Sequence, residues 1–227
     1  MTRNCALKAI VLLVLLIWGA LPGMAQQDRY DERDESVAPA ALAQFRKGER
    51  LAKNNRLDDA IAAFRQAITL QPDYVQAYQQ LGLAYAAGNR YPEAVKAFKE
   101  AARLQPQWGQ VHENLGVAYI KLGQWREARA QFSEAIRLDP AMAKAHKNLG
   151  LAYLNLEMLD QARKSLQEAV RLDPKDPQAH YALCVYYART GDTQAANREF
   201  QALKQLDPKL AEKLSNLIRP GAPAKKP

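Results

Sequence analysis

Hydrophobic positions recur along most of the chain with a period of 34 residues. A Leu-x-Pro phrase closes each period, and a glycine recurs at a fixed distance before it. The prolines are Pro72, Pro106, Pro140, Pro174 and Pro208, and the glycines are Gly48, Gly82, Gly116 and Gly150, with Cys184 taking the glycine's place in the fifth copy. A fixed period of this length is typical of a repeat array. The pattern therefore predicts five copies of one supersecondary unit.

Each copy contains two stretches with helical periodicity. The copies are numbered 1 to 34 from Ala41, Val75, Gly109, Ala143 and Pro177. Positions 4, 7, 8 and 11 share one face of a first helix, and positions 20, 24, 27 and 28 share one face of a second, because residues three and four apart lie on one side of a helix. Proline at position 32 ends the second helix, since it lacks the N–H that would continue the ladder.

At the predicted contact between the two helices, each copy has small residues at some positions and a large residue at another, always in the same places. Position 20 is alanine in every copy: Ala60, Ala94, Ala128, Ala162 and Ala196. Position 24 is Phe64, Phe98, Phe132, Leu166 and Phe200. Small residues at positions 8 and 20 would let the two helices approach closely, and the large residues at positions 11 and 24 would fill the space beside them.

This pattern resembles the tetratricopeptide repeat (TPR). The second copy carries all of its marker residues: Tyr78, Leu81, Gly82, Tyr85, Ala94, Phe98 and Pro106. The resemblance implies an all-α fold, a right-handed superhelical α-solenoid of five helix-turn-helix repeats. They span 41–74, 75–108, 109–142, 143–176 and 177–210. The terminal copies depart from the pattern, with Gln44 and Lys47 in the first and Cys184 and Leu203 in the fifth.

The first 25 residues are typical of a secretory signal peptide. Arg3 and Lys8 precede the apolar run 9–21, which Pro22 ends, and small residues lead up to Ala25. The run is shorter than the about 20 apolar residues of a spanning helix. We expect cleavage after Ala25, giving a periplasmic or secreted protein with no stable membrane insertion. The alternative is an uncleaved signal anchor that tethers the protein to the membrane.

The remaining flanks are short. Residues 26–40 are rich in Asp and Glu and predict a flexible acidic leader. Residues 211–219 carry Leu214, Leu217 and Ile218 at helical spacing, which suits a capping helix over the last repeat. Residues 220–227 predict a disordered Pro/Lys tail.

Composition excludes several functional classes. The formal net charge is +8, but basic residues in the repeats are spread among acidic ones instead of forming a basic stripe with interleaved aromatics. We therefore expect no nucleic-acid partner. The chain has two cysteines, and cleavage would leave Cys184 alone, so no intramolecular disulfide is expected.

Two constellations resemble chemical sites but favour a packing role. His112, His146 and His180 all lie at position 4, on equivalent helices about 8–10 Å apart or more, whereas ligands of one zinc ion must converge. Cys184 lies one helical turn after His180, but position 8 is a helix contact where a small buried cysteine is ordinary. With no Gly-rich phosphate loop and no catalytic triad spacing, we expect no enzyme, no metal and no cofactor.

The resemblance implies a binding groove instead. In the TPR family the first helices line a concave surface, and positions 2, 5, 6, 9, 12 and 13 contact the ligand. The positions carried over are Gln79, Leu83, Glu113, Asn114, Val117, Ile120, Lys121, Lys144, Lys147, Asn148, Leu151, Leu154, Tyr181 and Val185. Their centre is apolar, and lysines lie near the edge. Such a groove suits a peptide or helix of a partner protein.

One known device of the family is missing. The carboxylate clamp that grips chaperone C-termini needs Lys at 5 and Asn at 9 of one repeat, Asn at 6 of the next, and Lys at 2 and Arg at 6 of the third. Here the places hold Gln79, Leu83, Asn114, Lys144 and Asn148, of which only Asn114 and Lys144 match. A chaperone-tail role is therefore not implied.

The sequence as a whole favours a non-enzymatic adaptor or scaffold that holds a partner protein. Export would suit a role in envelope assembly or secretion. Two alternatives stay open. The array could be a structural subunit that associates end to end through its terminal repeats and the helix around residues 214–218, or an accessory subunit of an enzyme encoded elsewhere.

Overall fold

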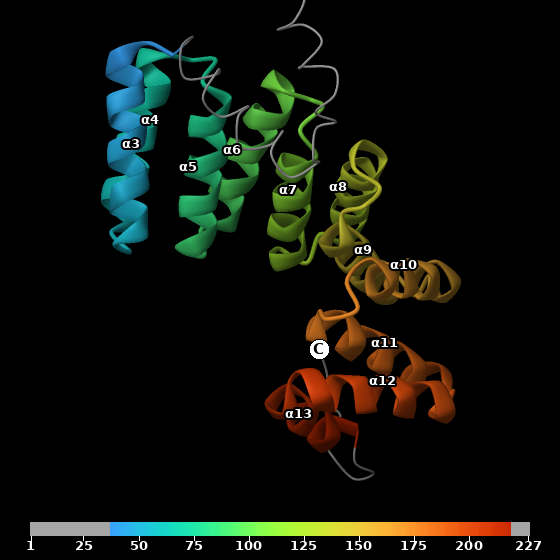
Figure 1. The fold of residues 1–227 in the computed structure, drawn as a ribbon. Helices are drawn as coiled ribbons and strands as arrows, with labels where there is room; N and C mark the ends of the chain where they lie inside the picture. The colour runs from blue at the N-terminus through green and yellow to red at the C-terminus, as the bar shows by residue number, and fades with distance from the viewer. Residues whose placement is uncertain (1–36, 219–227) are drawn as a thin grey trace, which may run out of the picture.

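The computed structural model describes residues 37–218, and that stretch folds into eleven α-helices without a strand (Figure 1). The all-α solenoid prediction is confirmed. The predicted signal peptide, residues 26–36 of the predicted leader and the predicted tail lie outside the described residues. No helix within 37–218 combines the length and hydrophobicity needed to cross a bilayer.

Ten of the helices form five antiparallel pairs, and the eleventh follows the last pair. The first helices are α3 (Pro39–Lys53), α5 (Val75–Ala87), α7 (Gly109–Lys121), α9 (Ala143–Asn155) and α11 (Pro177–Thr190). The second helices are α4 (Leu57–Leu70), α6 (Tyr91–Leu104), α8 (Trp125–Leu138), α10 (Leu159–Leu172) and α12 (Thr193–Leu206). The final helix is α13 (Pro208–Ile218).

The helices keep the period of the sequence. Every second helix begins at position 17 and ends at the leucine of position 30, two residues before the proline. This ending follows from proline chemistry, because proline disfavours helix in the residue before it. Four of the five first helices begin at position 1, and α3 begins two residues earlier.

The pairs stack in chain order. Each helix packs against its neighbours in the sequence, and the first helices also contact one another along one face, α3 with α5, α5 with α7, α7 with α9 and α9 with α11. In Figure 1 helices α3 to α8 stand side by side, and α9 to α13 turn away from them as the superhelix advances. The first helices therefore line the inner face of the array.

In four of the five repeats, a glycine lies beneath a large side chain in the core. A Cβ on Gly116 would lie 2.6 Å from the ring of Phe132, and one on Gly82 would lie 2.5 Å from Phe98. Both rings are buried. Glycine at position 8 is thus required by the ring at position 24, because the two helices meet with no room for a further carbon.

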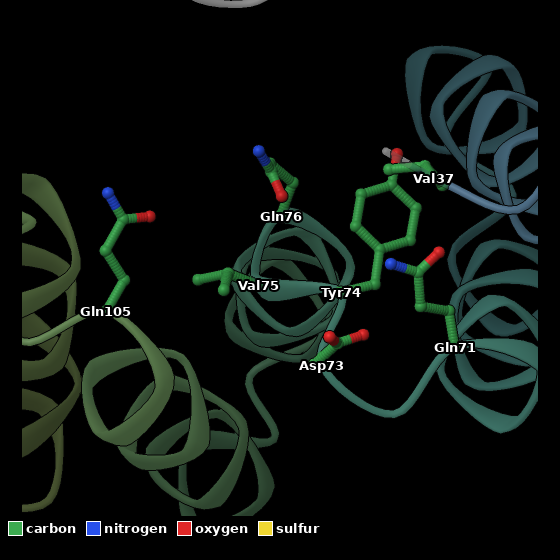
Figure 2. Close-up of a pocket in the computed structure, with 7 residues that line it drawn as sticks. All are labelled: Val37, Gln71, Asp73, Tyr74, Val75, Gln76 and Gln105. Atoms are coloured by element: carbon green, nitrogen blue, oxygen red, sulfur yellow. The ribbon is translucent and has the colours of Figure 1, made fainter. Parts of the chain in front are cut away.

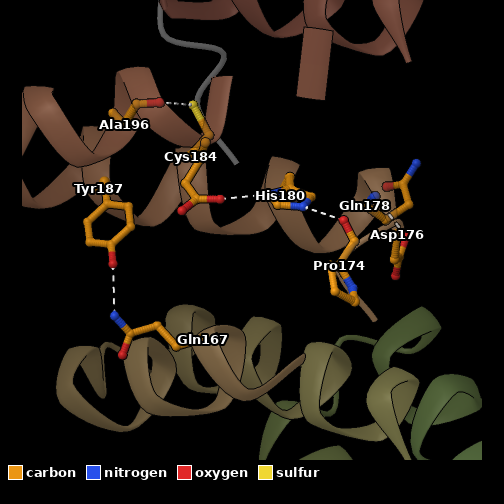
Figure 3. A network of polar contacts seen from close by, with 9 residues as sticks. Gln167, Pro174, Asp176, Gln178, His180, Cys184, Tyr187 and Ala196 are labelled. Carbon is orange, nitrogen blue, oxygen red and sulfur yellow. Dashed lines mark hydrogen bonds and ion pairs between the residues drawn. The ribbon is translucent and has the colours of Figure 1, made fainter. Parts of the chain in front are cut away.

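The fifth repeat solves the same contact differently. Cys184 replaces the glycine, and its Sγ lies 3.4 Å from the carbonyl oxygen of Ala196, to which it donates (Figure 3). Phe200 is only partly buried, unlike its equivalents, and Leu203 is fully buried where the other repeats have alanine. The larger Cys184 in place of glycine and the larger Leu203 in place of alanine therefore compensate for each other.

Both ends of the array are closed by short additions. Helix α13 begins at Pro208, three residues before the predicted capping helix, because Asp207 Oδ1 accepts from the backbone N–H of Leu210 at 2.9 Å and proline suits a first helical turn. Leu214 of α13 is buried against Cys184 and Leu203.

The N-terminal addition comes from residues that the sequence assigned to the leader. Val37 is buried in a cluster with Tyr74, and the N–H of Ala38 donates to Gln71 Oε1 at 2.8 Å. Residues 37–40 thus belong to the fold, since Val37 and the start of α3 cover the first repeat.

Candidate binding surface

An apolar row runs along the inner face of four repeats. It consists of the position 9 residues of α5, α7, α9 and α11, which are Leu83, Val117, Leu151 and Val185. Leu83 is 38% exposed, and the other three are partly buried. Among the position 12 residues, Ile120 is also partly exposed, whereas Leu154 is buried and belongs to the core. We call the four position 9 residues the apolar row.

A buried carboxylate lies beside this row. Glu113 of α7 is 7% exposed. It accepts from Gln110 Nε2 at 2.6 Å and from Asn148 Nδ2 of α9 at 3.3 Å. Burial raises the pKa of Glu113, and these two amides together with the ammonium groups of Lys144 and Lys147 offset only part of that effect.

The lysines near the predicted edge differ in their surroundings. Lys121 and Lys144 are exposed, as expected. Lys147 is not at an exposed edge, because its Nζ pairs with Asp176 Oδ2 at 2.7 Å and only 16% of its side chain is exposed. Asp176 also caps α11 by accepting from the N–H of Gln178. Burial alone would raise the pKa of Asp176, but Lys147 and the capping N–H groups lower it overall.

Arg189 links the fourth and fifth repeats at the other end of the first helices. Its Nη1 donates to the carbonyl oxygen of Leu154 at 3.1 Å, and its Nη2 lies 3.3 Å from Glu157 Oε1. Tyr181 and Val185 pack against the C-terminal core around Cys184. In the fifth repeat, Tyr181 therefore has mainly a packing role, and Val185 supplies apolar surface on the inner face.

Two amides occupy the junction between α5 and α7. Gln79 is 6% exposed, and its side chain forms no hydrogen bond with any residue in 37–218. Asn114 accepts from Gln110 Nε2 at 3.4 Å, while its own amide nitrogen donates to no described residue. Both lie on the inner face, one helical turn before Leu83 and Val117.

The three histidines have a shared structural role. Each Nε2 lies 3.0 Å from the carbonyl oxygen of the position 32 proline that precedes it, namely Pro106 for His112, Pro140 for His146 and Pro174 for His180. The Nδ1 of His180 also contacts Glu199 Oε2 at 2.7 Å. Figure 3 shows the contact of His180 with Pro174. The rings tie α7, α9 and α11 to the turns before them. Within 37–218 no three His, Cys, Asp or Glu side chains are grouped to hold a metal ion.

A small pocket of about 180 Å³ lies outside the apolar row, at the start of α5 (Figure 2). Its lining residues are Val37, Gln71, Asp73, Tyr74, Val75, Gln76 and Gln105. Gln71 and Gln105 are both at position 31, in two successive inter-repeat turns. Sequence patterns did not indicate this pocket, because it forms only where two turns and the N-terminal addition meet.

The structure separates the predicted groove residues into three groups. The apolar row, Ile120, Lys121 and Lys144 are accessible on the inner face. Glu113 and Asn148 bond between repeats, Lys147 bonds to the N-cap residue of the next first helix, Leu154 is core, and Tyr181 packs against the C-terminal core. Gln79 and Asn114 keep hydrogen-bonding capacity. Asp176 and Glu157, which pair with groove side chains, had no sequence signal, since each lies outside the ligand-contacting positions of the repeat.

Comparison with known proteins agrees with this architecture. A solved chain of MamA from Desulfovibrio magneticus RS-1, running from residue 41 to the end, is 24% identical, with a TM-score of 0.71 over 76% of this chain and 98% of that chain. PilF of Pseudomonas aeruginosa is 19% identical, with a TM-score of 0.69 over 82% of this chain and 86% of PilF. YrrB, described as a TPR protein with an unusual peptide-binding site, is 25% identical, with a TM-score of 0.65 over 82% of this chain and 95% of YrrB.

No curated protein is significantly similar to the chain. A family model does match: that of the cilia and flagella-associated protein 70 C-terminal domain aligns with residues 22–208. The match covers most of the sequence and all five repeats up to Pro208. The TPR resemblance is thereby confirmed, and the chain belongs to the TPR family of the cilia and flagella-associated protein 70 C-terminal domain.

Proposed function

We propose that this protein is an adaptor that holds a segment of a partner protein against the inner face of its solenoid. TPR proteins are typically non-enzymatic modules for protein–protein interaction. The observation that carries the proposal is the apolar row, four side chains that stay partly exposed at the same register of four consecutive repeats. The peptide-binding site described for YrrB supports the same use of the fold.

The chemistry of the row suits apolar anchors from the partner. The apolar row carries no charge. When a partner removes exposed apolar surface of this kind from water, the free energy of the complex falls, which favours binding. The exposed Lys121 and Lys144 would form a polar rim that affects association rate more than affinity. Binding energy is thus expected to concentrate on the row, as it does in most protein interfaces.

A matched pair of leucine variants tests this proposal. Leu83 and Leu206 are 38% and 39% exposed, but only Leu83 belongs to the apolar row. In a crosslinking pull-down from the native compartment, Leu83→Glu should reduce partner capture about 100-fold or more, because a charge enters a desolvated contact. Leu206→Glu should capture the partner normally. Both variants should melt within a few degrees of the wild type.

The opposite result would identify a different mode of assembly. If Leu206→Glu loses its complexes and Leu83→Glu keeps them, the partner binds the end of the array and the groove proposal is wrong. Leu151→Glu, two repeats further along the row, repeats the test at a second place.

We further propose that the protein acts outside the cytoplasm, in envelope assembly or secretion. The support is the basic start, the apolar run 9–21 and the small residues before Gln26. Intact mass of the protein purified from its native cells should correspond to a chain beginning at Gln26. A mass that includes residues 1–25, found in the membrane pellet, would instead establish the anchored alternative.

A further inference from the structure

The outer side of α3, at the N-terminal end of the array, carries charges of one sign along one helix face. Positions 7 and 10 are buried in each of the other four repeats, where they hold Leu, Ala and, once, Tyr186. In the first repeat the same positions hold Lys47 and Arg50, which are exposed because the array begins with this repeat. Arg46 and Lys53 lie on the same side of the helix, one turn before and one turn after Arg50. We call these four residues the basic face.

Acidic side chains of the fold leave this charge largely uncompensated. Apart from Arg46, the members of the basic face form no ion pair and no side-chain hydrogen bond with any residue in 37–218. The one acid of α3, Glu49, is at position 9, toward the inner face. At the nearby start of α4, the carboxylates of Asp58 and Asp59 lie 3.7 and 2.7 Å from arginines outside the basic face. The basic face therefore presents an excess of positive charge at this end of the molecule.

The need for solubility does not account for a single sign of charge. A terminal repeat needs a polar outer face, but a mixture of acids and bases provides one. The middle repeats carry such mixtures on their second helices, as ion pairs one turn apart: Glu100–Arg103, Glu134–Arg137 and Glu168–Arg171. A surface of cations alone attracts an anionic partner instead.

We propose that the basic face binds the anionic surface of a phospholipid bilayer, by adsorption and without insertion of a helix. A specific protein interface has an apolar centre, whereas the exposed residue amid these cations is Ala43, which offers no apolar anchor. Adsorption to lipid headgroups needs no such anchor, since each Lys or Arg near an anionic bilayer strengthens binding about 5-fold. Figure 1 shows α3 at the outer edge of the described helices, where a flat surface can approach it.

A second copy of this chain fits the basic face less well. End-to-end association would bring the basic face against the C-terminal end, which is itself basic. The exposed charged residues in 204–213 are Lys204, Lys209, Glu212 and Lys213. Like charges at such a contact repel one another. The export proposed above would bring the protein to a membrane, and the inference does not depend on the use of the groove.

The first test measures binding to vesicles. Protein purified from its native cells is sedimented at about 0.1 M salt with vesicles of phosphatidylcholine, either alone or mixed with phosphatidylglycerol. The wild type should prefer the vesicles that contain phosphatidylglycerol, and about 1 M salt, where the Debye length is about 3 Å, should abolish the preference. Lys47→Gln together with Arg50→Gln should weaken binding to these vesicles about 30-fold, because two cations are removed.

The matched control removes one lysine and one arginine from an exposed place on α10, far along the array. Arg163→Gln together with Lys164→Gln changes the net charge equally and should bind within about 2-fold of the wild type, because charges beyond a Debye length from the bilayer are screened. Equal losses in the two double variants would show that net charge alone binds the vesicles, and would overturn the inference. Equal wild-type binding to both kinds of vesicle would also overturn it, since a retained apolar run 9–21 would bind either kind.

The second test locates the surface that touches the bilayer. Lysines are acylated with a water-soluble reagent, with and without vesicles that contain phosphatidylglycerol, and are identified by mass spectrometry. Lys47 and Lys53 should lose most of their labelling when the vesicles are present, whereas the exposed Lys164 and Lys213 should be labelled as before. Protection of Lys164 or Lys213 without protection of Lys47 would assign the contact to another surface and would contradict the inference.

The inference and the groove proposal can fail separately. Leu83→Glu tests partner capture and leaves the basic face intact, so its loss of partner should not be accompanied by a loss of vesicle binding. A wild type that shows no preference for the anionic vesicles would overturn the inference alone. If Lys47→Gln together with Arg50→Gln then reduced partner capture, the basic face would serve an acidic protein instead of a bilayer.

Discussion

At the scale of single residues, the core follows from matched sizes on facing helices. Gly116 lies under Phe132, and Ala128 at position 20 is fully buried while Ala130, two residues on, is exposed. This contrast is the one that helical periodicity predicts. Core residues could therefore be identified from the sequence, because each repeat reproduces the same contact and the pattern appears five times.

The polar residues of the inner face could not be predicted in the same way. Their partners lie 29 to 35 residues away: Lys147 pairs with Asp176, the N-cap residue of α11, and Glu113 pairs with Asn148 in the next repeat. Whether such a pair meets depends on how far one repeat rotates on the next. The periodic pattern fixes the face on which a side chain lies, but it does not fix this rotation.

Glu113 gives a prediction that depends on pH. Its pKa is raised above the ordinary 4.5 by burial, so the folded state holds the proton more tightly than the unfolded chain. Stability of the wild type should therefore fall as pH rises from the ordinary carboxyl pKa through the raised pKa of Glu113. Glu113→Gln keeps an acceptor for Gln110 and removes the titration.

The measurement is chemical denaturation of both proteins across this pH range. Glu113→Gln should gain stability relative to the wild type as pH rises, and the difference should be constant above the raised pKa. A matched exposed variant, Glu127→Gln, should show no such trend. A difference between Glu113→Gln and the wild type that does not change with pH would show that Glu113 does not titrate in this window.

At the scale of helices, the proline at position 32 determines where each second helix ends, and the sequence predicts those ends. The sequence did not indicate how α3 and α13 begin, because both starts depend on contacts outside the repeat pattern. Pro208 was assigned only as the end of the fifth repeat, yet it also opens α13 with Asp207 as its cap. A residue that ends one helix can thus start the next.

The turn between paired helices shows a second effect at this scale. Position 15 adopts a left-handed backbone in all five repeats, filled by Asn55, Asn89, Gly123, Glu157 and Gly191. Asn and Gly are ordinary there, but Glu157 has a φ of 60° that side chains larger than Asn rarely adopt. Arg189 of the next repeat contacts both Glu157 and the carbonyl oxygen at the end of α9. The turn between α9 and α10 is therefore stabilised by Arg189 of the fifth repeat rather than by the residue at its own position 15.

At the scale of the whole molecule, each repeat is stabilised by the interface with its neighbours, so the fifth repeat depends on α13, which covers its outer end. Leu214 of α13 is 2% exposed and packs in the cluster that contains Cys184 and Leu203. Leu214 is consequently part of the protein's own core. An end-to-end association of copies would have to use other residues of the C-terminal end, such as the exposed Leu206.

Cys184 makes the dependence on α13 measurable. Its thiol is buried, and burial together with the charge of Glu199 raises its pKa, so it should react with a thiol reagent only when the last repeat opens. In a Cys5→Ser background, Leu214→Ala should remove about 2 kcal/mol or more from the fifth repeat and speed Cys184 labelling about 30-fold. The matched control is Lys213→Ala, an exposed change on the same helix, which should label like the parent protein.

Equal labelling rates for the two variants would show that α13 does not hold the end of the array closed. A fall of the whole helical signal in one step, with no early labelling, would mean instead that the five repeats unfold together.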